Sequence, residues 1–240
     1  MSKCRIIIFL ILFFLPRLAP ATDTASLLQR AGEYGRELSQ IQASVKTASL
    51  EKLLRQGNKI AAELKMVIEQ LSDEDYASVE RNMKGYIVNR VEVILVEPDT
   101  RFFSKLAGKI GTAEDLLYFN FMLNVMPDGY WPVYITRQTD VGGCIDFGSS
   151  SLSTLYKEGT GILPKLTEYY RKQVNRTLED IADQLTNGTC ACGKIASVKK
   201  EFQTFVEMNP KASITATVRA RLEALQRGDH AVRENCIGGT

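Results

Sequence analysis

Apolar side chains in the first part of the chain recur at alternating spacings of four and three residues, which is the period of one helix face. They form two runs: Leu27, Ala31, Tyr34, Leu38, Ile41, Val45 and Ala48, then Leu50, Leu53, Gly57, Ile60, Leu64, Val67 and Leu71. The register slips by two between the runs, which indicates either a stutter in one long helix or a turn between two helices. Residues 46–49 are mostly polar, which favours the turn. We therefore predict an antiparallel helical hairpin over residues 22–71, whose Leu27–Leu71 seam packs on the rest of the protein.

The segment that follows, up to residue 125, contains three sequence signals for the start of a helix. Ser72 precedes three acidic residues, and Asp99 and Thr112 precede two further apolar segments. Such side chains cap the first backbone N–H groups of a helix, and acidic residues in the first turn are stabilised by the helix dipole. Thr112 and Asp115 have the spacing of a capping box, with Asp in place of the usual Glu or Gln. Helices are therefore expected over residues 73–84, 100–110 and 113–125.

A β-hairpin is predicted in the middle of the chain. Tyr130–Arg137 follows a Pro-Asp-Gly turn and shows strand-like alternation, and Cys144–Phe147 returns after a Gly-Gly turn. Two strands alone are marginally stable, so this hairpin needs helices or a third strand to pack on. Tyr86–Val96 is rich in Val and Ile and fits either a strand or a buried helix, so it is the candidate third strand.

The remainder of the chain returns to helical periodicity. Helices are expected over residues 150–157, 166–185, 194–208 and 213–226. The predicted fold class is mostly α: a multi-helix domain with an N-terminal helical hairpin and a small β-hairpin insert. We expect residues 22–240 to form a single domain, made of the hairpin (22–71), a central aromatic-rich part with the β insert (86–148) and the C-terminal helices (150–240).

The first residues have the features of a cleaved export signal. Lys3 and Arg5 precede the unbroken apolar run Ile6–Leu15, and Ala19-Pro20-Ala21 offers a small-x-small cleavage site. The run is too short for a permanent bilayer-spanning helix, although an uncleaved anchor is the alternative. Residues 1–21 are therefore interpreted as a signal peptide, and the protein is expected to be secreted or periplasmic, with no stable transmembrane segment.

Four cysteines remain after this leader, an even number that favours two disulfides in an oxidising compartment. They are Cys144, Cys190, Cys192 and Cys236. A bond between 190 and 192 would close a very small ring. Two pairings stay open, 144–190 with 192–236 or 144–192 with 190–236. A four-thiolate zinc site is the alternative, but the usual C-x₂-C pairs are missing.

Composition narrows the function classes. The chain of 240 residues has 30 basic and 28 acidic residues, and three of the basic ones lie in the leader. Such a nearly neutral protein lacks the cationic field of a nucleic-acid binder, so no nucleic-acid partner is expected. His230 is the only histidine, which argues against a His-based triad or a multi-histidine metal site. We expect no metal and no cofactor.

The candidate binding chemistry lies between residues 101 and 148. Nine of the 17 aromatic residues that follow the leader fall in this stretch. Aromatic clusters build cores, but they also line recognition surfaces. We predict an aromatic pocket beside the hairpin, with polar groups near the hairpin turn. The predicted ligand-binding residues are Tyr130, Trp131, Tyr134, Arg137, Asp140 and Asp146.

These features predict an exported, disulfide-stabilised protein that binds a partner protein or an apolar ligand. Catalysis is not the leading expectation. The alternative is a glycan hydrolase that uses two carboxylates, with candidates in Glu97, Asp99, Asp140 and Asp146. Self-association through the Leu27–Leu71 seam is a third possibility.

Overall fold

The protein is mostly α-helical. The computed structural model describes residues 23–44, 46–91, 93–139 and 142–236. The elements in chain order are α1 Thr24–Ala43, α2 Glu51–Val67, the 3₁₀ turn η1 Ile68–Gln70, α3 Asp73–Asn82, β1 Tyr86–Asn89, β2 Leu95–Pro98, α4 Thr100–Ile110, α5 Ala113–Val125, β3 Ile135–Arg137, β4 Gly143–Ile145, α6 Ser151–Ile162, η2 Leu163–Lys165, α7 Glu168–Asn187, α8 Ile195–Met208 and α9 Thr215–Arg227. The predicted fold class is confirmed, while the predicted leader over residues 1–21 lies outside the described residues.

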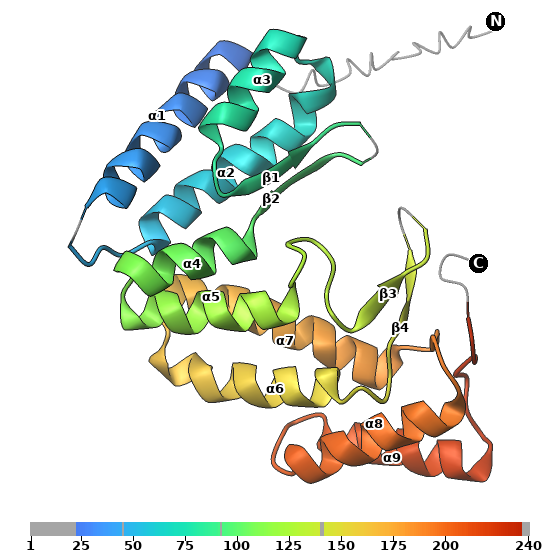
Figure 1. Ribbon diagram of the computed structural model, residues 1–240. Helices are drawn as coiled ribbons and strands as arrows, with labels where there is room; N and C mark the ends of the chain where they lie inside the picture. Colours follow the sequence, from blue (N-terminus) through green and yellow to red (C-terminus); the bar gives the residue numbers. More distant parts are fainter. Residues whose placement is uncertain (1–22, 45, 92, 140–141, 237–240) are drawn as a thin grey trace, which may run out of the picture.

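The helices form three successive groups (Figure 1). α1, α2 and α3 lie at one end with the β1–β2 hairpin, α4 to α7 form the middle, and α8 and α9 pack together at the other end. No helix in the described part of the chain is both long enough and apolar enough to cross a bilayer.

The N-terminal helical hairpin is confirmed. α1 ends at Ala43 and α2 begins at Glu51, so the seam slip marks a turn. The turn is anchored to the middle group, because the Ala48 N–H donates to the Ile110 carbonyl at 2.8 Å. Val45 lies outside the described residues. The described seam positions that are buried are Leu27, Ala31, Tyr34, Leu38, Leu50, Leu53, Gly57, Ile60, Leu64 and Leu71. These side chains already face the rest of this chain, and self-association through the seam stays a prediction.

The predicted helix starts are confirmed by their hydrogen bonds. The side chains of Ser72 and Asp99 accept backbone N–H bonds at the starts of α3 and α4. Thr112 and Asp115 form the predicted capping box of α5. The Asp115 carboxylate is fully buried and also accepts from the Leu50 N–H at 3.0 Å and from the Tyr170 hydroxyl at 2.5 Å. One carboxylate therefore joins the starts of α2 and α5 to α7.

The β structure differs from the prediction. Tyr86–Val96 does not join the central hairpin: β1 and β2 form a two-stranded hairpin of their own, with Tyr86 opposite Pro98. The predicted strand Tyr130–Arg137 is also too long, because only its last three residues pair with β4. The Val133 N–H donates to the Val125 carbonyl at the end of α5, so the first half of this segment folds back on that helix instead of extending.

The two disulfides take one of the two pairings that the sequence left open: Cys144–Cys192 and Cys190–Cys236. The two bonds join three extended segments that lie side by side. Ile145 in β4 forms a parallel bridge with Ala191, and Cys190 forms another with Arg233. The β3–β4 hairpin therefore packs beside residues 190–192 and the C-terminal segment, and not beside residues 86–96 as predicted.

The C-terminal helices form where predicted, although α6 continues to Ile162 past the expected end at residue 157. Gly159 lies inside it and permits close packing, because a Cβ there would lie 2.8 Å from Leu178 and 3.0 Å from Phe121. This close approach brings α5, α6 and α7 together in the middle of the molecule. α5 and α7 also form two walls of the cavity described next.

Candidate functional site

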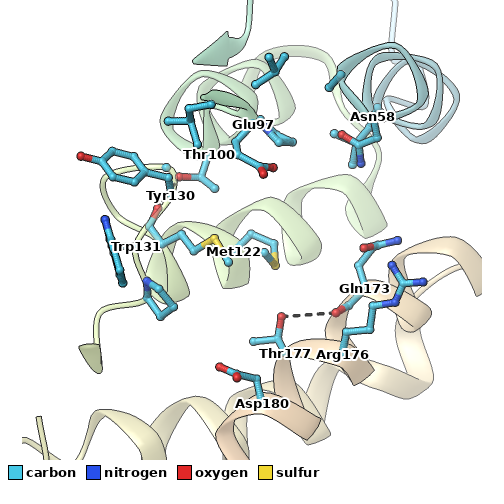
Figure 2. A pocket seen from close by; sticks show the side chains of 18 of the residues that line it. Asn58, Glu97, Thr100, Met122, Tyr130, Trp131, Gln173, Arg176, Thr177 and Asp180 are labelled. Carbon is cyan, nitrogen blue, oxygen red and sulfur yellow. Dashed lines mark hydrogen bonds between the residues drawn. The ribbon is translucent and has the colours of Figure 1, made fainter. Parts of the chain in front are cut away.

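A cavity of about 640 Å³ lies between the N-terminal hairpin and the middle helices. Its walls come from α2, β2, the first residue of α4, α5, the loop that follows α5, β3 and α7. Figure 2 shows Met122 of α5 in the centre, Glu97 and Thr100 on one side, and the α7 residues facing them. These segments are distant in sequence, so only the folded chain creates the cavity.

The α5 side of the cavity is apolar. Its lining residues there are Tyr118, Phe119, Met122 and Met126. Burial raises the pKa of the Tyr118 phenol well above its usual value, so this ring stays neutral. Aromatic rings and flexible methionine side chains adapt to apolar groups of varied shape.

The loop after α5 is held in place by two contacts. The Thr100 hydroxyl donates to the Met126 carbonyl at 2.7 Å, which ties the start of the loop to α4. Gly129 has a φ of +89°, and a Cβ there would lie 2.4 Å from the Ile87 side chain. A glycine is therefore required where the loop turns against β1. This turn places Tyr130 and Trp131 at the cavity (Figure 2).

The α7 side is polar. Its lining residues are Gln173, Arg176, Thr177 and Asp180, spaced three, four and seven residues from the first. This spacing places them on one helix face. The Tyr134 hydroxyl donates to Asp180 at 2.5 Å. Burial, followed by this contact with the Asp180 carboxylate, raises the pKa of the Tyr134 phenol far above its usual value, so it remains a neutral donor.

Partnered polar groups complete the α2 side. Lys65 forms an ion pair with Glu97. The Tyr86 hydroxyl donates to Asn58 at 2.7 Å, and the Asn58 amide donates to the Tyr169 hydroxyl at 2.9 Å. These groups fix one another, so this wall is preorganised before anything binds.

The structure brings most of the predicted site residues together. Those that line the cavity are Tyr130, Trp131, Tyr134 and Arg137. Asp140 lies outside the described residues. Asp146 does not line the cavity; its backbone N–H donates to the Tyr134 carbonyl at 2.9 Å. Whether these residues bind a ligand stays a prediction.

Sequence reasoning did not identify the α2 and α7 walls. The polar face of Gln173, Arg176, Thr177 and Asp180 was visible as helical spacing, but exposed helix faces usually look the same. Glu97, considered as a catalytic carboxylate, lies in this cavity, while Asp99 caps α4. Within the described ranges, no cluster of three or more His, Cys, Asp or Glu residues has an arrangement that fits a metal ion.

Comparison with known proteins assigns no family to the chain. No family model matches it, and no curated protein and no solved structure was found to be similar. The cavity and the two disulfides are therefore the features of the molecule that bear on its function.

Proposed function

We propose that this is an exported, disulfide-stabilised binding protein that holds a small, largely apolar ligand in the cavity between α2, α5 and α7. The observation that carries this proposal is the preformed cavity itself, with its volume of about 640 Å³ and its aromatic and methionine-rich wall. Small-molecule sites typically measure about 300–1,000 Å³ and combine apolar walls with a few fixed polar groups. A concave site of this kind is better suited to a small ligand than to the flat surface of a partner protein.

Two features support export. The sequence begins with a basic, apolar and small-residue pattern typical of a signal peptide. The four cysteines beyond it are all paired in the structure, and such bonds persist in oxidising compartments. Secretion or a periplasmic location is therefore the compartment that we propose.

Filling the cavity tests the binding role. Ala62 lines the cavity on α2, although the residue itself is exposed, so Ala62→Trp places an indole at the cavity without disturbing the core. We expect this change to weaken binding of the neutral fluorescent probe N-phenyl-1-naphthylamine by at least about tenfold, because the ring occupies the space that the probe needs. Fluorescence titration of the purified, oxidised protein measures the effect.

Met66→Trp is the matched control for this experiment. Met66 lies one turn further along α2, is 74 % exposed and does not line the cavity. It is expected to leave probe affinity unchanged. Equal affinities of all three proteins, or no probe binding by the wild type, would contradict the binding proposal.

Glycan hydrolysis is the second candidate, because Glu97 and Asp180 both line the cavity. Both carboxylates already have protein partners, Lys65 and Tyr134, whereas a glycosidase needs one carboxyl kept protonated as a general acid. Release of nitrophenol from nitrophenyl glycosides by the wild type, and its loss in Glu97→Gln, would establish the hydrolase. We expect no release from either protein.

A further inference from the structure

We propose that the ligand of this cavity carries a single carboxylate on an apolar chain, and that Arg176 binds the carboxylate. This inference rests on the proposed binding function and specifies its ligand class. It starts from the division of the cavity into an apolar α5 wall and a polar α7 wall (Figure 2). A ligand that satisfies both walls must itself have an apolar part and a polar part.

The chemistry of the ligand's polar part follows from which polar side chains of the cavity already have a protein partner. Lys65 is paired with Glu97, Asp180 accepts from Tyr134, and the Arg137 Nε donates to the Thr139 carbonyl. Arg176 differs: within the described part of the chain its guanidinium has no hydrogen bond and no ion pair. Arg176 is exposed, so its donors bind water, which an incoming oxyanion at the cavity can replace.

The charges at the cavity favour a monoanion. The described lining residues include three cationic side chains, Lys65, Arg137 and Arg176, and two carboxylates, Glu97 and Asp180. Among these described residues Lys65 is already neutralised by Glu97, and the single positive charge that Arg176 offers is matched by one carboxylate. A phosphate monoester carries close to two negative charges at neutral pH and fits this balance less well.

Gln173 provides a second polar contact. It lies one turn before Arg176 on the same face of α7, and its side-chain amide has no protein partner in the described ranges. The amide N–H₂ and the guanidinium can together donate to the two oxygens of one carboxylate. Asp180 lies one turn beyond Arg176 on the same face of α7. Its negative charge repels an anion and so favours binding on the Gln173 side of Arg176.

With the head group at Arg176, the apolar part of the ligand can extend in only one direction along the cavity. From Arg176 the cavity continues across Met122 to Tyr130 and Trp131 (Figure 2). A flexible alkyl chain can follow this path against methionine and aromatic side chains. The geometry thus points to a single-chain amphiphile with its head at α7 and its tail at the loop after α5.

The test is a displacement assay with two chains of equal length. Dodecanoate below its micellar concentration and dodecanol below its solubility limit compete with N-phenyl-1-naphthylamine for the oxidised protein at neutral pH. The wild type is expected to bind dodecanoate about tenfold more tightly than dodecanol, because a charge-assisted pair with Arg176 is available only to the acid. Dodecyl phosphate is the third competitor and is expected to bind more weakly than dodecanoate.

Arg176→Gln is expected to remove the preference for the acid while keeping the affinities for the probe and for dodecanol. Lys172→Gln is the matched control, since it removes the same charge from an exposed position of α7 that does not line the cavity. If the wild type binds the probe but does not prefer the acid, or if both variants lose the preference equally, the carboxylate proposal is wrong and the binding proposal stands. A phosphate preferred over the carboxylate would overturn the assigned head group.

Discussion

Replacement of Glu201 by alanine is expected to lower the free energy of unfolding by about 4 kcal/mol. The Glu201 side chain on α8 is fully buried. Its carboxylate accepts the N–H groups of Gly148 and Ser150 at 3.0 and 2.8 Å, and the N–H and hydroxyl of Ser153 at 3.0 and 2.7 Å. These donors belong to the start of α6 and the turn before it, where the N-cap residue Ser150 makes no side-chain capping bond. Alanine leaves the buried donors of Ser153 and the half-buried N–H groups of Gly148 and Ser150 without this acceptor.

Urea unfolding followed by circular dichroism measures this loss. Glu201→Gln keeps the shape but places an N–H₂ group against N–H donors, so a smaller loss of about 2 kcal/mol is expected. Glu207→Ala, at an exposed position of the same helix, is the control and should change the stability by less than about 0.5 kcal/mol. Similar values for the Ala variants at 201 and 207 would show that α6 does not depend on the α8 carboxylate.

Loss of the Cys190–Cys236 bond, by replacement of both residues with alanine, is expected to cost about 4 kcal/mol in the chain-entropy description of cross-links. The bond closes a loop with a sequence separation of 46 residues. It also holds the parallel bridge between Cys190 and Arg233, which attaches the C-terminal segment to residues 190–192. Without it, this segment gains freedom mainly in the unfolded chain.

The same measurement on Cys144→Ala/Cys192→Ala provides the comparison, because that bond has a nearly equal sequence separation of 48 residues. The two double variants should therefore lose similar stability. The two covalent loops share only residues 190–192, so the loss on removing both bonds should be close to the sum of the two losses. A loss below about 1 kcal/mol for either double variant would contradict the entropic argument.

Features that depend on neighbouring residues were predictable from the sequence. The turn between α1 and α2 follows from a register slip in one apolar seam, and the capping box of Thr112 and Asp115 follows from two side chains three residues apart. The aromatic-rich stretch was also visible in the sequence. It contributes both to the core and to the lining of the cavity. Phe103 is fully buried in the core, while Tyr130 and Trp131 line the cavity.

Features that depend on contacts between distant segments were not predictable. Tyr86–Val96 has strand composition, but its pairing is decided by a turn within the segment, so it forms its own hairpin. Nothing local distinguishes Glu201 from the solvated acidic residues of other helices; its burial follows from the packing of α8 against α6. The α7 wall of the cavity is likewise functional only because the fold places it opposite α5.

The pairing of the cysteines has a consequence for biosynthesis. Cys190 is made before Cys192, yet the native partner of Cys144 is Cys192. If Cys144 first pairs with Cys190, exchange can restore the native bond, because attack of the Cys192 thiolate on the sulfur of Cys144 releases Cys190 as a thiolate. Cys190 is then ready for oxidation with Cys236, the last of the four to emerge from the ribosome. The native pairing therefore lies one local exchange, over two residues, from the pairing that would form first in chain order.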